Sequence, residues 1–171
     1  SGHPEYGDTV ALDLGRGQFP VTTEPWALHG ADDNRDLPDM ILGADNLADA
    51  DGDGDLDVFI GGRVIPSQYP KPASSTLYIN QDGKLKPDGN NSFVFLDIGL
   101  VSGSVFSDID NDGDPDLILA LEWGPITILQ NNKGQFKDVT ASLGLSNFKG
   151  WWNGVATGDF NEDGLLDIVA T

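Results

Sequence analysis

The sequence predicts an all-β fold assembled from repeated antiparallel units of about four strands. Three observations predict it: glycine and proline are frequent, the apolar runs between them are short, and one aspartate-rich motif recurs. Glycine and proline account for 22 and 10 of the 171 residues, which leaves no segment regular enough for a long helix. The hydrophobic content of 39% is that of a folded chain. We therefore expect one domain of short strands and tight turns.

The recurring motif is D-x-[DN]-x-D-G-x-x-D. It occupies residues 49–57, 108–116 and 159–167. Each copy follows a stretch of small residues and precedes β-branched or apolar residues, so each is expected in the turn of a hairpin. The copies start about 50 to 60 residues apart, close to the roughly 40–50 residues of a four-stranded propeller blade. The repeat therefore predicts about three propeller-like blades.

The strands of each blade follow from this frame. First strands are expected at 43–48, 103–107 and 154–158, and second strands at 58–60, 117–119 and 168–169. A shared pattern predicts third and fourth strands at 76–80 with 83–85, at 126–130 with 134–136, and at 9–12 with 17–19. We expect a single domain, 1–171, with blade portions at about 9–42, 43–97, 101–140 and 153–171.

The last blade lacks outer strands of its own. Residues 9–22, a neighbouring chain, or sequence beyond this segment would supply them. An open blade edge invites strand pairing, so self-association is one expected arrangement.

The motif has the chemistry of a calcium loop. Ca²⁺ takes six to eight oxygen ligands, and carboxylates at positions 1, 3 and 5 of a turning loop converge on one point. Glycine at position 6 makes the turn, position 7 binds through its backbone carbonyl because leucine serves there once, and the aspartate at position 9 closes the shell. The expected ligands are Asp49, Asp51, Asp53, Asp55, Asp57, Asp108, Asp110, Asp112, Asp114, Asp116, Asp159, Asn161, Asp163, Leu165 and Asp167.

Other loop types fit less well. An EF-hand needs an acid at position 12 and flanking helices, whereas Ile60, Leu119 and Ala170 stand there. A plain Asp-Gly hairpin turn would explain one copy but not the repeated ligand spacing. The third loop has Asn161 in place of an acid and should bind more weakly. Residues 32–39 echo the motif without its glycine, which favours a solvated acidic loop there.

Charge supports the same interpretation. The formal net charge is −19, and self-repulsion of this size weakens a compact state unless cations neutralise it. About three Ca²⁺ ions would reduce the formal charge to −13, which is still acidic. The acidity excludes nucleic acid as a partner, the absence of cysteine excludes thiol chemistry, and no apolar run is long enough for membrane insertion.

With these motifs the sequence resembles FG-GAP/VCBS repeats, the calcium-loop blades of integrin-α-like β-propellers. Segments 61–63, 66–70, 122–125 and 150–153 look most like ASPIC/UnbV-type and cartilage-acidic-protein-like members. The resemblance implies a seven-bladed propeller, an extracellular or periplasmic location, and a role in adhesion or ligand recognition. This chain departs from that pattern because it holds only about three blades.

Two functions remain open from the sequence. The first is a non-enzymatic module whose blades present loops to a protein or glycan. The second is part of a calcium-dependent polysaccharide-degrading enzyme, although His3 and His29 are isolated and no H-E-x-x-H or G-x-S-x-G motif occurs. The proline-rich loop 66–75 is expected to project and to contact a partner. Tyr69 in this loop is an expected ligand-binding residue, and so are three tryptophans: Trp123, Trp151 and Trp152. For the tryptophans, packing between blades is the alternative.

Overall fold

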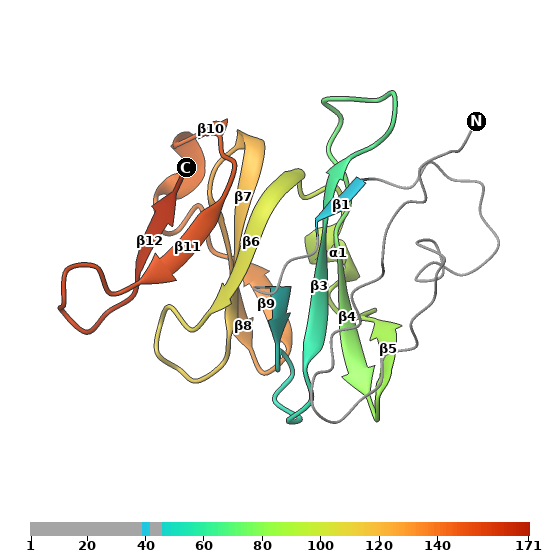
Figure 1. Ribbon diagram of the computed structural model, residues 1–171, viewed down its shortest axis with the longest axis vertical. Coiled ribbons are helices and arrows are strands. Elements are labelled where there is room, and N and C mark those ends of the chain that lie inside the picture. The colour runs from blue at the N-terminus through green and yellow to red at the C-terminus, as the bar shows by residue number, and fades with distance from the viewer. Residues whose placement is uncertain (1–38, 42–45) are drawn as a thin grey trace, which may run out of the picture.

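The computed structural model describes residues 39–41 and 46–171 (Figure 1). These residues form antiparallel sheets with one four-residue helix, α1 (Ser92–Phe95), and one 3-10 turn, Leu145–Asn147. The all-β class expected from the turn residues is therefore confirmed. The strands expected at 9–12 and 17–19, and all but the last residue of the acidic segment 32–39, lie outside the described residues.

The first blade is built around β3 (Asp57–Val64). β1 (Asp39–Ile41) and β2 (Leu47–Ala48) pair with the two ends of β3. β4 (Thr76–Gln81) pairs with the opposite edge of β3, and β5 (Lys84–Pro87) closes the sheet.

The second blade repeats this order. β6 (Leu100–Ser107), β7 (Asp116–Gly124), β8 (Thr127–Asn132) and β9 (Gln135–Asp138) pair in sequence. The short strand β10 (Gly150–Trp151) adds to the far end of β7. A final hairpin of β11 (Val155–Gly158) and β12 (Asp167–Ala170) forms the inner half of a third blade. The strands expected beside the second and third motifs are present, and β2 lies within the strand expected at 43–48, of which residues 43–45 lie outside the described residues.

The core lies between the blades, and β7 serves two parts of it. Side chains alternate across a strand, so Leu117, Leu119 and Leu121 face the first blade, where they join the cluster that holds Phe59 and Phe95. Ile118 and Ala120 point the other way, into the cluster that contacts the third blade. All five β7 side chains are at most 4% exposed. The blades are therefore stacked face to face on a strand that is buried on both sides.

The stacking places the connecting loops at two opposite ends. The three aspartate motifs link β2 to β3, β6 to β7 and β11 to β12, at the lower end of the blades in Figure 1. The β3–β4 loop projects at the other end of its blade. The fold thus separates a set of acidic loops from a set of longer, less acidic connections.

Candidate metal centre

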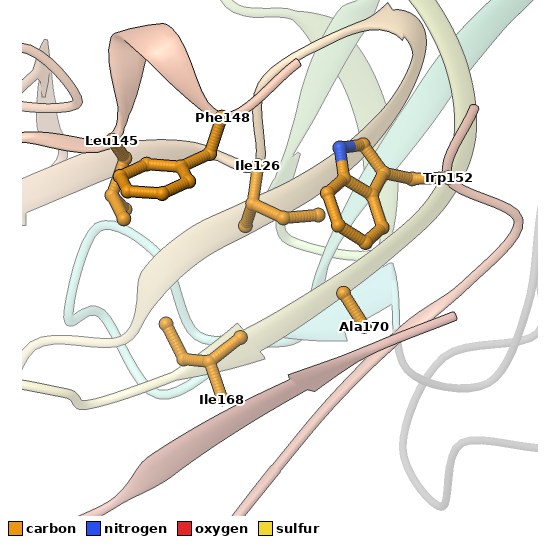
Figure 2. Close-up of a pocket in the computed structure, with 6 residues that line it drawn as sticks. All are labelled: Ile126, Leu145, Phe148, Trp152, Ile168 and Ala170. Carbon is orange, nitrogen blue, oxygen red and sulfur yellow. The ribbon is translucent and has the colours of Figure 1, made fainter. Parts of the chain in front are cut away.

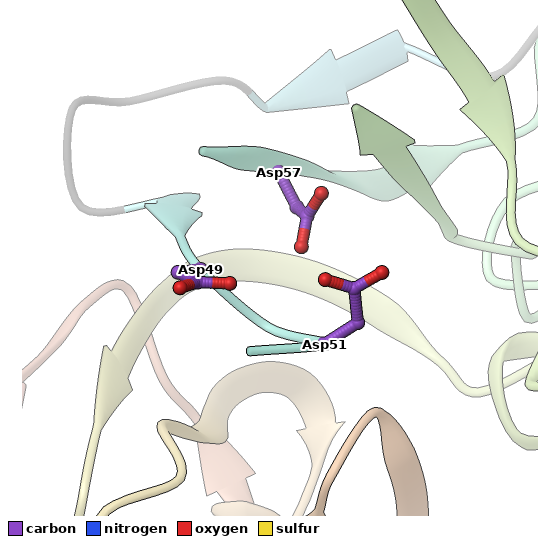
Figure 3. A group of neighbouring side chains, drawn as sticks. All are labelled: Asp49, Asp51 and Asp57. Atoms are coloured by element: carbon purple, nitrogen blue, oxygen red, sulfur yellow. The ribbon is translucent and has the colours of Figure 1, made fainter. Parts of the chain in front are cut away.

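The β2–β3 loop brings three carboxylates together. Asp49, Asp51 and Asp57 each place a carboxylate oxygen within 4.8 Å of the others, and Figure 3 shows the three side chains converging on one point. Asp49 and Asp51 precede the turn, whereas Asp57 is the first residue of β3. A cation at this point would therefore join the two sides of the hairpin.

Backbone hydrogen bonds hold the loop in this shape. Gly54 lies in the left-handed region at φ 97°, a conformation that favours glycine. Its N–H donates to Asp49 Oδ2 at 2.9 Å, and the N–H of Asp55 donates to Asp53 Oδ1 at 2.9 Å. The sequence D-x-D-x-D-G therefore folds back on itself and aims its carboxylates inward.

Asp57 is the unusual member of the group because it is fully buried. Its two oxygens accept hydrogen bonds from the N–H groups of Ala50 and Asn80, each at 2.8 Å. Burial, with smaller contributions from the charges of Asp51 and Asp53, nevertheless raises the pKa of Asp57 to about 6 against the lowering effect of the hydrogen bonds. A bound cation would remove this penalty, because opposite charge stabilises the carboxylate.

The β6–β7 loop reproduces the arrangement. Asp108, Asp110 and Asp116 also place carboxylate oxygens within 4.8 Å of one another. Asp116 is fully buried, and burial is the main cause that raises its pKa. Gly113 again has φ 97° and donates to Asp108 Oδ2 at 2.9 Å. Two loops at separate positions in the sequence therefore have the same geometry.

The remaining expected ligands of these two loops lie on the turn itself. Asp53 and Asp112 each accept an N–H from the residue two positions later. The Asp114 carboxylate accepts the N–H of Lys133 at 2.9 Å, so this side chain is engaged outside its loop. That position 7, which also includes Asp55, offers its backbone carbonyl to an ion stays a prediction.

The β11–β12 loop has the same backbone with one acid fewer. Gly164 N–H donates to Asp159 Oδ2 at 2.9 Å, and Phe160 N–H donates to Asp167 Oδ2 at 3.0 Å. Leu165 N–H donates to Asp163 Oδ1 at 2.8 Å. Asn161 stands at the third position, and Asp167 is only half-buried. This loop offers the single amide oxygen of Asn161 in place of a carboxylate, and it therefore carries less negative charge.

The same loops are part of a repeat that is known from a protein family. A family model described as FG-GAP-like repeat matches residues 49–119 and 108–170. The two matches overlap and together span most of the chain. The chain belongs to the FG-GAP-like repeat family. Each FG-GAP match begins at the first aspartate of a loop and ends within the β-strand that follows the next loop. Among curated proteins, none matches the chain at a significant level.

No helix of the FG-GAP repeats, in the part of the chain that the structure describes, could span a membrane. Its helical segments lack the length and apolar character that a membrane-spanning helix requires.

Asn131 physically connects the first two FG-GAP loops. Its backbone N–H donates to Asp116 Oδ1 at 2.8 Å in the second loop. Its side-chain amide donates to the carbonyl of Ala50 in the first loop at 2.8 Å, and to the carbonyl of Pro115 at 3.1 Å. Asn131 is fully buried. Asn131 lies outside the aspartate motif and was not predicted from the sequence, although a signal was present: Asn80 and Asn131 each stand three residues before the glycine of a β-turn.

Replacement of Asn131 should destabilise the chain through this connection. Asn131→Ala leaves the buried Ala50 carbonyl without its donor, which costs about 1–3 kcal/mol for an unsatisfied buried group. We expect a lower urea midpoint with an unchanged slope in equilibrium unfolding. Asn132→Ala is the matched control, because Asn132 is exposed. Equal midpoints for the two variants would contradict a role of the amide in joining the loops.

The four expected aromatic ligand residues divide into two groups. Tyr69, Trp123 and Trp151 lie together on the surface, more than half exposed. Trp152 turns away from them: its Nε1–H donates to the carbonyl of Gly124 at 3.1 Å, and its ring lines an apolar pocket with Ile126 and Ala170 (Figure 2). Trp152 thus takes the packing role between the second and third blades that was the alternative for the tryptophans.

Proposed function

We propose that this chain is a non-catalytic recognition module in which Ca²⁺, held by the three aspartate loops, stabilises the blade hairpins. The opposite ends of the blades then present loops to a protein or glycan partner. One observation carries the proposal: two separate loops each hold three converging carboxylates, and in each loop one of these carboxylates is fully buried.

The charges around these carboxylates support a cation. Within the described residues, no lysine or arginine side chain forms an ion pair with them; Arg63 instead pairs with Glu122. Three acids that share a site repel one another, and a buried carboxylate is costly unless it is paired or coordinates a metal. Ca²⁺ suits the donor set because all of the donors are oxygen atoms.

The position of the carboxylates explains what the ion would do. Asp49 and Asp51 follow β2, and Asp57 begins β3, so one ion ties two strands of a blade together. Asp108, Asp110 and Asp116 do the same for β6 and β7. An extracellular or periplasmic location fits this role, because extracellular calcium modules work at roughly 10⁻⁴–10⁻³ M Ca²⁺, a concentration that would saturate these loops. Recognition rather than catalysis is also the general role of FG-GAP repeats.

Calorimetric titration of Ca²⁺ into the chelator-treated chain tests the proposal. We expect the first two loops to bind with Kd of roughly 10⁻⁶–10⁻⁵ M and the third about tenfold more weakly, because Asn161 reduces its charge. Asp163→Ala should remove the weak site alone, whereas Asp110→Ala should remove one of the tighter sites.

Mg²⁺ provides the control, since it demands a smaller octahedral site and should bind less tightly. Absence of saturable Ca²⁺ binding at millimolar concentration would reduce the loops to acidic turns and would end the proposal.

A further inference from the structure

Three aromatic side chains from distant segments meet at the end of the blades opposite the aspartate loops. Tyr69 comes from the β3–β4 loop, Trp123 from the end of β7 and Trp151 from β10. The indole N–H of Trp123 donates to the Tyr69 hydroxyl. The rings of Trp123 and Trp151 lie with centroids 5.0 Å apart at an interplanar angle of 42°. We call these three residues the aromatic platform.

The three side chains of the aromatic platform are largely exposed to solvent and add little to the core. Tyr69, Trp123 and Trp151 are 51%, 55% and 57% exposed, whereas Phe59 and Phe95 of the inter-blade core are at most 1% exposed. Trp123 also has φ 62°, which is strained for a bulky side chain. Strained residues of this kind cluster at binding sites, where the surrounding structure holds them in place. Exposure and strain together indicate a contact surface rather than a packing role.

A polar pair lies directly beside the rings. Glu122, 7% exposed, accepts a hydrogen bond from the Arg63 guanidinium at 2.7 Å. The Tyr69 hydroxyl donates to the other Glu122 oxygen at 3.4 Å. The Arg63 side chain is 44% exposed, so its remaining N–H groups are accessible next to the platform. The pair carries no net charge but offers both hydrogen-bond donors and acceptors.

We propose that the aromatic platform, with Arg63 and Glu122, binds a neutral saccharide. Aromatic faces of tryptophan and tyrosine contact the apolar C–H face of a sugar ring. Arg63 donates to a sugar hydroxyl, and the Tyr69 hydroxyl accepts from another. This inference rests on the proposed function, because it assigns the partner class and the surface of the same recognition module.

Charge selects a neutral sugar over its charged relatives. The net charge of −19 repels uronic acids and sulfated saccharides. A cationic ligand would use cation–π contacts with the rings, but the adjacent Glu122 charge is already neutralised by Arg63, and the exposed guanidinium repels a second cation. A ligand with hydroxyl groups and no charge satisfies both the rings and the ion pair.

The test uses the calcium-loaded chain and a panel of hexasaccharides. Neutral cello-, xylo-, manno- and laminari-hexaose are compared with hexagalacturonate and with an arginine hexapeptide. Binding is followed by NMR of the indole N–H groups. We expect at least one neutral hexaose to shift the Trp123 and Trp151 resonances saturably. The Trp152 resonance is an internal reference, since that N–H is bonded to Gly124, and it should not move.

Variants then locate the site. Trp123→Ala and Trp151→Ala should each weaken binding about tenfold, the loss expected for one stacking ring. Phe93→Ala is the control, because Phe93 is 86% exposed on α1 and should leave binding unchanged. Trp123→Phe retains a ring if the alanine variant fails to fold, and it should bind with an intermediate affinity.

The outcomes separate this inference from the calcium proposal. Failure of every neutral hexaose to shift Trp123 or Trp151, in a chain that binds Ca²⁺, overturns the saccharide site alone. Stronger binding of the arginine hexapeptide or hexagalacturonate overturns it as well, as does hexaose binding that survives both alanine variants. Hexaose binding in a chain without Ca²⁺ affinity supports the platform and removes the calcium role.

Discussion

Chelation of calcium is expected to lower the melting temperature of this chain by about 10–20 °C. Each site contributes about 2.7 kcal/mol when Ca²⁺ stands at 100 times its Kd, and the two tighter loops together contribute about 5 kcal/mol. A change of 1 kcal/mol shifts the melting point of a domain of this size by roughly 2–4 °C. Circular dichroism melts in 1 mM CaCl₂ and in EDTA, at equal ionic strength, measure the difference.

Two controls make this result specific to the loops. MgCl₂ at the same concentration should restore only a small part of the shift, because Mg²⁺ demands a smaller octahedral site. Simple screening of the −19 charge does not depend on ion size, so it would make the two salts equally effective. Asp57→Ala combined with Asp116→Ala should leave melting almost indifferent to EDTA. Equal melting points of the unaltered chain in CaCl₂ and EDTA would contradict a stabilising role for the ion.

The stability of the chelated chain is expected to fall as pH rises from about 4 to above 6. Burial raises the pKa of Asp57 to about 6 in the folded state from 3.8, so within this window the folded chain binds more protons than the unfolded chain. The stabilisation from protonated Asp57 is present below about pH 4 and is lost above pH 6. A shift of about two units corresponds to roughly 3 kcal/mol. The raised pKa of Asp116 acts in the same direction.

Calcium should reverse this pH dependence. Binding requires ionised carboxylates, so the calcium-loaded chain should gain stability as pH rises through 6, where the chelated chain has lost it. Urea unfolding at pH 4.5 and pH 7, with and without EDTA, measures both slopes. Asp57→Asn should flatten the EDTA profile, while the exposed Asp97→Asn should preserve it. A chelated chain that is more stable at pH 7 than at pH 4.5 would show that Asp57 is not a desolvated acid.

The sequence was most informative where structure is local. The aspartate loops could be predicted because their ligand positions lie within nine residues and their turn depends on a glycine such as Gly113. The strands around them could be predicted because alternation and turn residues are also local signals. Asn131 could not be assigned its role in this way, because its amide reaches Ala50 in the preceding blade.

The aromatic residues show the same limit. Trp151 and Trp152 are adjacent in the sequence, yet one is exposed beside Trp123 and the other packs between blades. Neighbouring side chains of an extended segment point in opposite directions, and the sequence does not say which direction is outward. Tyr69 joins Trp123 only through the length and path of the β3–β4 loop. Contacts of this kind depend on the tertiary arrangement.

The double-sided burial of β7 has a consequence for strand registration. In a strand with one solvent face, a slip by one residue would expose its apolar side chains, which penalises the slip. A slip of β7 by one residue would turn its leucines toward the third blade and its isoleucine and alanine toward the first blade. All of these side chains would remain buried. The alignment of this strand is therefore fixed at its polar ends, by Asp116 with Ile109 and Asn131, and by Glu122 with Arg63. A cation bound to Asp116 would therefore help to fix the alignment of β7 in its blade.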